Sequence, residues 1–204
     1  MADDKPQLYL ASPHLPDMAT FPDLLSRILD AHSVACLRLD LSTRDEDELL
    51  RIADAMRAVT EPRDVALVIT EHFRIAQRAG LDGVHLPDGT RTVRKARTEL
   101  GSDAIVGAFC GTSRHDGMNA GEAGADYISF GPLGQSDLGD GTRADPELFA
   151  WWSEMIELPV VAEGHLDEAM LGRLSTIADF VTLGDEIWSA PDPSARLGAL
   201  LSAL

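Results

Sequence analysis

Apolar residues along the chain form short continuous runs, separated by longer segments in which apolar positions recur at helical spacing. Segment 65–70, VALVIT, is almost wholly apolar and has charged neighbours, which is typical of a parallel strand covered on both faces. In segment 42–59 the spacing of Leu49, Ile52 and Met56 predicts one buried face of a helix. By these criteria, strands are predicted at 8–11, 34–40, 65–70, 83–86, 104–109, 126–130, 159–162 and 180–183.

Capping residues and glycines mark the ends of the helices expected between these strands. Ser42 or Thr43 is expected to cap the helix of segment 42–59, where residues 45–48 suit its positive end. Gly80 and Gly101 are expected to stop two others. The predicted helices cover 22–31, much of 42–59, 73–79, 92–100, 116–123, 146–156, 167–174 and 195–204.

Strict alternation of strand and helix predicts a parallel sheet, and eight such units predict its closure into a (β/α)₈ TIM barrel. We expect one domain over residues 1–204, with short helices, because 204 residues is few for this fold. The long irregular segment 133–145 follows the sixth strand, at the C-terminal mouth where barrel active sites lie. It is either a lid or an ordinary polar surface loop.

Charge narrows the classes of partner. The chain has 34 acidic and 17 basic residues, a formal net charge of −17, which repels nucleic acid and anionic membranes. An anionic substrate would therefore need a local basic or metal-bearing pocket.

Cys36 and Cys110 lie in apolar runs and are expected to be buried, reduced thiols. With no signal-peptide pattern and no apolar run near the ~18 residues of a membrane span, we expect a cytoplasmic protein.

Four segments match a family pattern in order. GLDGVHL at 80–86 resembles GADGVHLG, and GADYISFGP at 124–132 resembles GADYIGFGP. LPVVAEG at 158–164 resembles IPVVAIGG, and IADFVTLGDEIW at 177–188 resembles ADGVAVISAIF. These are the patterns of the thiamine phosphate synthase/TenI family, which the chain resembles from residue 8 onward.

The resemblance implies a (β/α)₈ barrel and a role in thiamine biosynthesis. The synthases join hydroxymethylpyrimidine diphosphate to thiazole phosphate, with release of diphosphate and use of Mg²⁺, whereas the TenI branch aromatises a thiazole intermediate. Two alternatives stay open. One is a diverged paralogue that serves as a regulatory or ligand-binding barrel, and the other is an enzyme for an unphosphorylated substrate. In each case the expected partner is a small molecule at the C-terminal mouth.

Residues at the family's substrate-binding positions differ from the pattern. After the second strand, the Gln, Arg and Lys of the family's QLREK fall on Arg38, Asp40 and Ser42, so that two cations are lost and one acid is gained. Arg38 either supplies positive charge to a substrate or forms a salt bridge inside the barrel. The resemblance also assigns substrate contacts to the positions after the fifth and sixth strands, namely Cys110, Thr112 and Gly131.

Metal and acid–base positions are also changed. Glu71 falls on one magnesium-binding Asp of the family, and Asp88 lies two residues before the second position, which is Thr90. Carboxylates suit a hard cation, so Glu71 and Asp88 are the candidate Mg²⁺ ligands. Thr112 replaces the family histidine, and the nearby His115 is a candidate displaced acid–base.

Acidic residues fall where the family holds phosphate. The GG after the seventh strand becomes Glu163–Gly164, and the Ser after the eighth strand becomes Asp185, followed by Glu186. Two like charges ~4 Å apart at an effective dielectric constant of ~20 repel by roughly 4 kcal/mol, so these acids are expected to disfavour phosphate.

The remaining expectations concern two histidines, one cation in the loop after the sixth strand, and a subunit interface. Glu163 and His165 are a candidate proton-transfer pair, and His85 is expected to be packed and hydrogen-bonded inside the barrel. The loop after the sixth strand has Arg143 as its nearest cation. Leu15, Met18 and Phe21 are candidates for the interface of a homodimer.

Overall fold

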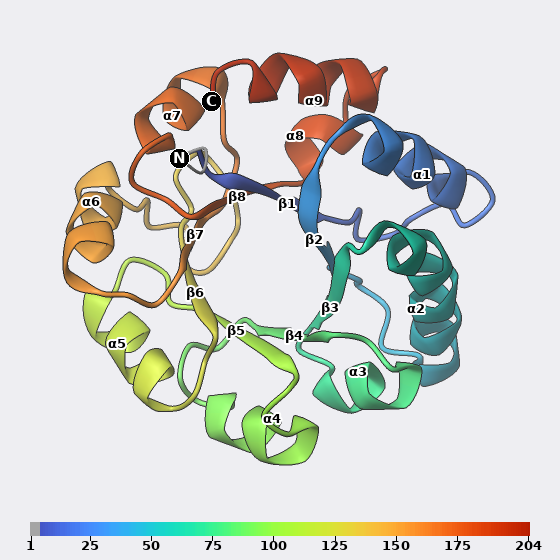
Figure 1. Ribbon diagram of the computed structural model, residues 1–204, viewed down its shortest axis with the longest axis horizontal. Coiled ribbons are helices and arrows are strands. Elements are labelled where there is room, and N and C mark those ends of the chain that lie inside the picture. The colour runs from blue at the N-terminus through green and yellow to red at the C-terminus, as the bar shows by residue number, and fades with distance from the viewer. Residues whose placement is uncertain (1–4) are drawn as a thin grey trace.

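Eight parallel strands form a closed barrel surrounded by helices (Figure 1). The structure, a computed structural model, describes residues 5–204. Strands pair in chain order, and β8 pairs with β1 to close the barrel, which confirms the predicted TIM barrel. The strands are β1 (Gln7–Ala11), β2 (Val34–Leu39), β3 (Ala66–Thr70), β4 (Gly83–Leu86), β5 (Ile105–Phe109), β6 (Tyr127–Phe130), β7 (Val160–Ala162) and β8 (Phe180–Leu183).

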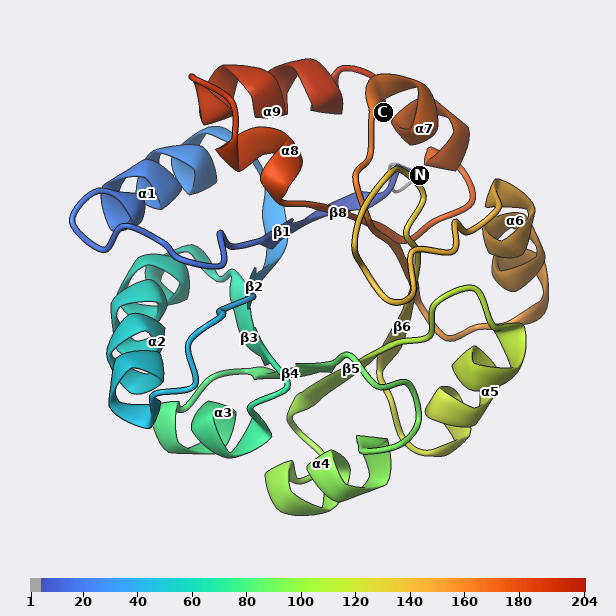
Figure 2. The same cartoon turned by 180° about the vertical axis from the view of Figure 1, so that it is seen from behind.

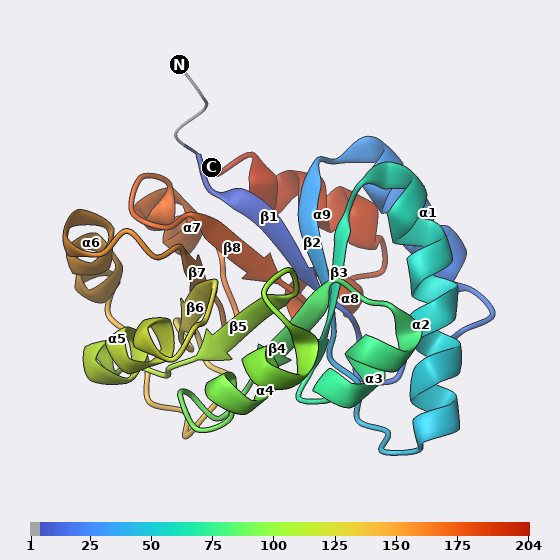
Figure 3. The same ribbon diagram turned by 60° about the horizontal axis from the view of Figure 1, so that its bottom comes forward.

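Helices cover the outside of the barrel and bury their apolar faces against it (Figures 1 and 3). They are α1 (Phe21–Ala31), α2 (Glu46–Thr60), α3 (Phe73–Ala79), α4 (Val93–Leu100), α5 (Arg114–Glu122), α6 (Pro146–Met155), α7 (Glu168–Leu174), α8 (Asp185–Trp188) and α9 (Pro193–Leu201), with a 3₁₀ turn η1 (Glu61–Arg63). Two of these elements, η1 and α8, were absent from the prediction. Both are single turns, too short for an apolar period to be recognised.

The N-terminal cap of α2 differs from the prediction. Asp45 caps the helix, because its carboxylate accepts the backbone N–H of Glu48 at 2.9 Å. Thr43 instead donates to the Glu48 carboxylate at 2.6 Å and accepts the N–H of Asp45. The prediction of Ser42 or Thr43 as the cap was therefore wrong. The expected stops at Gly80 and Gly101 are confirmed, and Gly80 has a positive φ of 64°.

Side chains inside the barrel form two layers of different chemistry. One layer is mostly apolar and contains Tyr9, Cys36, Val68, Tyr127 and Val161. Successive inward residues of a strand are two positions apart, so the next layer towards the C-terminal ends begins two residues later. That layer is polar and buried, and contains Arg38, His85, Ser129, Glu163 and Thr182.

Gly107 on β5 makes room for the ring of Tyr127 on the neighbouring strand. A Cβ atom at Gly107 would lie 2.0 Å from Tyr127 Cζ. The space allows the Tyr127 hydroxyl to lie 2.7 Å from the Tyr9 hydroxyl and 2.9 Å from His85 Nδ1. The two layers are therefore joined at Tyr127, as expected for a packed and hydrogen-bonded His85.

The 133–145 loop passes over the C-terminal opening of the barrel (Figure 2). At its start, Leu133 N–H donates to the Glu163 carbonyl at 3.2 Å and Gly134 N–H donates to the Gly164 carbonyl at 2.7 Å. At its end, Ala144 N–H donates to the Pro132 carbonyl at 2.7 Å. The loop is thus tied to the residues that follow β7. Its movement as a lid stays a prediction.

The candidate interface residues near the N-terminus divide into exposed and buried ones. Leu15 is 77% exposed, whereas Phe21 is buried and packs edge-on against Trp188 at 5.2 Å between ring centroids. Phe21 therefore belongs to the core of its own chain, and the homodimer stays a prediction.

We expect Gly107→Ala to destabilise the barrel by about 1–3 kcal/mol, because the added methyl group overpacks against Tyr127. Gly198→Ala is the matched control, since nothing lies within 4 Å of a Cβ at this helical position, and alanine favours a helix. Urea unfolding measures both. A Gly107→Ala variant as stable as Gly198→Ala would contradict the packing described here.

Candidate functional site

A cavity of about 630 Å³ opens at the C-terminal ends of β1, β2, β7 and β8. Residues 135–139 of the loop after β6 form one wall. The cavity brings together six of the predicted site residues: Arg38, Asp40, Glu163, Gly164, His165 and Asp185. Its lining also includes Glu186, one of the acids expected to disfavour phosphate, and three residues that sequence reasoning did not assign to a site: Ser12, His14 and Thr182.

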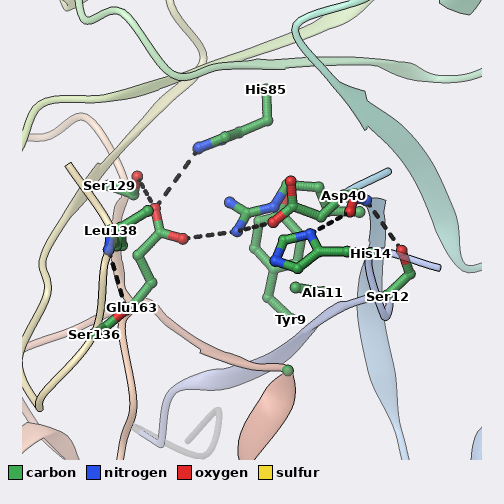
Figure 4. Close-up of polar contacts among 12 residues, drawn as sticks. Tyr9, Ala11, Ser12, His14, Asp40, His85, Ser129, Ser136, Leu138 and Glu163 are labelled. Carbon is green, nitrogen blue, oxygen red and sulfur yellow. Dashed lines mark hydrogen bonds and ion pairs between the residues drawn. The ribbon is translucent and has the colours of Figure 1, made fainter. Parts of the chain in front are cut away.

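A buried ion pair lies at the inner end of this cavity. Arg38 NH2 on β2 donates to Glu163 Oε2, directly after β7, at 2.8 Å, and the two residues are 5% and 2% exposed. Ser129 Oγ donates to the other carboxylate oxygen of Glu163, and His85 Nε2 lies 3.7 Å from that oxygen (Figure 4). Asp40 Oδ2 lies 3.8 Å from Arg38 NH2, nearer the opening. Of the two roles considered for Arg38, the structure shows the salt bridge inside the barrel.

The surroundings hold the pair ionised and His85 neutral. Burial alone would raise the pKa of Glu163, but Arg38, His85 and Ser129 together lower it below its usual value. Burial opposes the charge on Arg38, yet Glu163 and then Tyr9 and Asp40 raise its pKa. Burial and the charge of Arg38 lower the pKa of His85 to about 3, against the opposing effect of Glu163. At neutral pH the His85–Glu163 contact therefore joins a neutral ring to a carboxylate.

Two atoms of Arg38 and one of Thr182 have hydrogen-bonding capacity to spare. Arg38 Nε and NH1 and Thr182 Oγ1 are buried and have no hydrogen-bond partner within residues 5–204. Both residues line the cavity. A buried polar atom without a partner is costly, so a polar group that reached these atoms would gain their hydrogen bonds. Strand alternation could have identified Thr182, since it follows the inward-facing Phe180 by two positions.

The three acids expected to repel phosphate have different environments. Glu163 is neutralised by Arg38. Glu186 accepts the backbone N–H of Leu166 at 2.9 Å through Oε1 and that of Gly184 at 2.7 Å through Oε2. Asp185 is exposed and lines the cavity. Backbone N–H groups leave Glu186 charged, so Asp185 and Glu186 are the two of these acids that have no cationic partner within residues 5–204.

His165 does not form the predicted proton-transfer pair with Glu163. The hydrogen-bond donors to Glu163 are Arg38 and Ser129, and the histidine beside it is His85. His165 is exposed, with a φ of 58° in the left-handed region. The sequence separation of two residues was misleading, because Glu163 points into the barrel and His165 lies in the following loop.

Four predicted residues after β5 and β6 do not line the cavity. Cys110 is buried, its Sγ lies 3.5 Å from the Ala108 carbonyl, and burial raises its pKa to about 12. Thr112 and His115 are exposed at the start of α5. Gly131 packs closely, since a Cβ there would lie 2.3 Å from the Glu163 carbonyl oxygen. Their proposed contacts with a substrate have no support in this geometry.

Glu71 and Asp88 lie apart from the main cavity. They line a second hollow of about 550 Å³, which Arg44, Arg74 and Lys95 share. Asp88 Oδ1 accepts a hydrogen bond from Thr92 Oγ1 at 2.8 Å. Over residues 5–204, no group of three or more His, Cys, Asp or Glu side chains could hold a metal ion. Glu46 and Arg78 also line this hollow and pair with each other at 2.6 Å. Three carboxylates among four cations do not fit the oxygen-rich Mg²⁺ site that the resemblance implies.

Comparison with known proteins gives consistent matches over almost the whole chain. The family model described as thiamine monophosphate synthase matches residues 8–187. A thiamine-phosphate synthase of Rhodospirillum centenum is 39% identical over 189 residues, which cover 91% of this chain and 90% of the relative. A thiamine-phosphate synthase of Erythrobacter litoralis is 36% identical and covers 93% of this chain and 91% of the relative.

Solved structures support the fold. Thiamine phosphate pyrophosphorylase from Pyrococcus furiosus superimposes with a TM-score of 0.84 at 20% identity, covering 98% of this chain and 96% of that one. A 3-hexulose-6-phosphate synthase gives a TM-score of 0.70 at 19% identity, covering 97% and 99%. Within residues 5–204 no helix is long and apolar enough to cross a membrane.

We expect Arg38→Met to destabilise the protein by about 3–5 kcal/mol, because it leaves the Glu163 carboxylate buried without its partner. Adding Glu163→Leu should recover most of this loss, since an apolar pair of similar volume is often tolerated. Urea unfolding of both single variants and the double variant measures the coupling. Additive losses would contradict a direct interaction.

We expect the free energy of unfolding to fall as the pH drops from 6.5 towards 3. In this range the unfolded chain binds a proton at residue 85, whereas burial holds the pKa of folded His85 at about 3 from its ordinary 6.5. The stability that the neutral, buried His85 contributes is fully present above pH 6.5, and it falls by about 1.4 kcal/mol per pH unit below that pH. His85→Gln should remove this part of the slope.

Urea unfolding between pH 4 and 7 measures the slope of the free energy of unfolding against pH. A loss of stability in the variant that is the same at every pH does not change this slope. His115→Gln, at an exposed histidine, is the matched control. Equal slopes for His85→Gln and the wild type would show that His85 is protonated in the folded protein.

Proposed function

The chain belongs to the thiamine monophosphate synthase family, and on that premise we propose that it joins a pyrimidine and a thiazole precursor of thiamine in the mouth cavity. The reaction forms a bond between the thiazole nitrogen and the methylene carbon of hydroxymethylpyrimidine diphosphate. The bond from that carbon to the diphosphate oxygen breaks, and diphosphate leaves with the electron pair. The observation that carries the proposal is the match to relatives named thiamine-phosphate synthase over about nine-tenths of both chains.

The charge of the cavity suits the positive charge that develops on the two rings. Asp40, Asp137 and Asp185 line the cavity, and fixed negative groups stabilise a cation that forms in the transition state. The ring nitrogen ends the reaction as a cationic thiazolium. These acids therefore favour the product side of the bond-forming step.

Arg38 supplies the donors for the anionic end of the pyrimidine substrate. It is the one arginine or lysine that lines the cavity within residues 5–204. Its Nε and NH1 atoms have no acceptor in that part of the chain, and an Arg–phosphate contact is a charge-assisted hydrogen bond. We assign these two N–H groups to the diphosphate.

The family implies Mg²⁺, but Glu71 and Asp88 do not form a site that fits it. No step is therefore assigned to a metal ion. We propose the cytoplasm as the location, in line with membership of the thiamine monophosphate synthase family.

A second candidate is the binding of an unphosphorylated ligand without synthesis. It is favoured by the Arg38–Glu163 pair, because the single cation of the cavity is already engaged by a carboxylate at 2.8 Å. In this reading the barrel is a regulatory or small-ligand-binding relative of the synthases.

Incubation of the purified protein with hydroxymethylpyrimidine diphosphate and thiazole phosphate, with and without Mg²⁺, should yield thiamine phosphate and diphosphate. The double variant Arg38→Met with Glu163→Leu should lose this activity, because it lacks the guanidinium group. Arg143→Met removes the same charge from an exposed loop position outside the cavity lining and should retain activity.

Absence of thiamine phosphate above background would overturn the proposed synthesis. Calorimetric binding of the unphosphorylated thiazole alcohol by an inactive protein would then support the second candidate. Full activity of the double variant would contradict the role of Arg38.

A further inference from the structure

The Glu186 carboxylate occupies two backbone N–H groups that belong to different loops. Leu166 lies between β7 and α7, and Gly184 directly follows β8. Glu186 bridges them, with Oε1 2.9 Å from Leu166 N and Oε2 2.7 Å from Gly184 N. Each of its oxygens thus takes one N–H, in the way that two oxygens of a bound anion would.

The position of these N–H groups is that of an anion site in barrels of this kind. Phosphate is frequently bound by the loops that follow the seventh and eighth strands, through backbone N–H groups. In this chain the anion at that position is part of the protein. Glu186 has a further consequence for the charge of the cavity, since it adds to the acids at Asp40 and Asp185.

Nearby buried atoms show that the same cavity has unmet capacity for a ligand. Thr182 is 4% exposed and Arg38 is 5% exposed. Thr182 Oγ1 and Arg38 Nε and NH1 have no partner among the described residues 5–204, and both residues line the cavity with Glu186.

We propose that Glu186 is a specificity-determining residue that acts as an internal substitute for a ligand's phosphate. A phosphate ester must displace the Glu186 carboxylate from Leu166 and Gly184 before it gains the same N–H groups, whereas the corresponding alcohol keeps Glu186 in place. The residue thereby weakens the binding of a phosphorylated thiazole relative to its unphosphorylated alcohol, and synthesis from the phosphate proceeds at the cost of this displacement. The identity of the ring rests on the proposed function, but the weaker binding of phosphate does not.

Glu186→Ala tests this inference, and alanine is also the residue of the family segment ADGVAVISAIF at the matching position. The substitution frees both N–H groups, so that inorganic phosphate should bind to the variant at least about tenfold more tightly than to the wild type. Asp185→Ala is the matched control, because it removes the same charge from the adjacent position and its side chain is exposed. It should change the affinity for phosphate by less than about threefold.

Calorimetry with inorganic phosphate, thiazole phosphate and thiazole alcohol measures the affinities. The expected result is a gain for both phosphates in Glu186→Ala alone, with the alcohol changed little. Equal gains in both variants would show a general charge effect and overturn the inference, as would no gain in either.

Thermal stability provides a second measurement that does not depend on activity. Phosphate should raise the melting temperature of Glu186→Ala more than that of Asp185→Ala, because a ligand stabilises the state that binds it. If Glu186→Ala does not fold, Glu186→Gln against Asp185→Asn takes its place, and equal shifts would again overturn the inference. These binding and stability measurements do not involve turnover, so they test the role of Glu186 even if the wild type does not synthesise thiamine phosphate.

Discussion

The buried ion pair between Arg38 and Glu163 organises the C-terminal layer of the barrel. Two charges at 5% and 2% exposure are stable there only because they neutralise each other and hydrogen-bond. The pair holds Ser129 and His85 around one carboxylate and lowers the pKa of His85. Through His85 and Tyr127 it extends to the opposite layer of the barrel, so that the site and the core share one network.

This arrangement separates the roles of acids that look alike in the sequence. Glu163 is held inside the barrel as part of the ion pair, Glu186 is bound to backbone N–H groups, and Asp185 faces the cavity. The electrostatic field that a ligand meets therefore depends on partners more than on the number of acids. A cavity built in this way suits a ring on which positive charge develops, and it is selective about where phosphate can lie.

Much of the fold followed from local patterns, and much of the site did not. The eight strands were predictable because each is a short, mostly apolar run, and 83–86 and 180–183 coincide with β4 and β8. The family resemblance led to Arg38, Glu163 and Asp185, which do meet at one cavity. The partners of Glu163 were not predictable from local patterns, because they come from other strands: Ser129 from the neighbouring β6 and His85 from β4. The single turn α8, which carries Glu186, lies below the length at which periodicity is informative.

The hydrogen bonds at the start of the 133–145 loop link entry to the cavity with the placement of Glu163. Leu133 N–H is bonded to the main-chain carbonyl of Glu163, and Gly134 N–H to that of Gly164. Residues 135–139, directly after them, form the wall of the cavity. On its other side, Glu163 N–H donates to the Phe130 carbonyl at 3.1 Å. The backbone that carries the buried carboxylate is therefore held from both sides by β6 and the loop that follows it, so that the wall of the cavity and the ion pair share one main-chain frame.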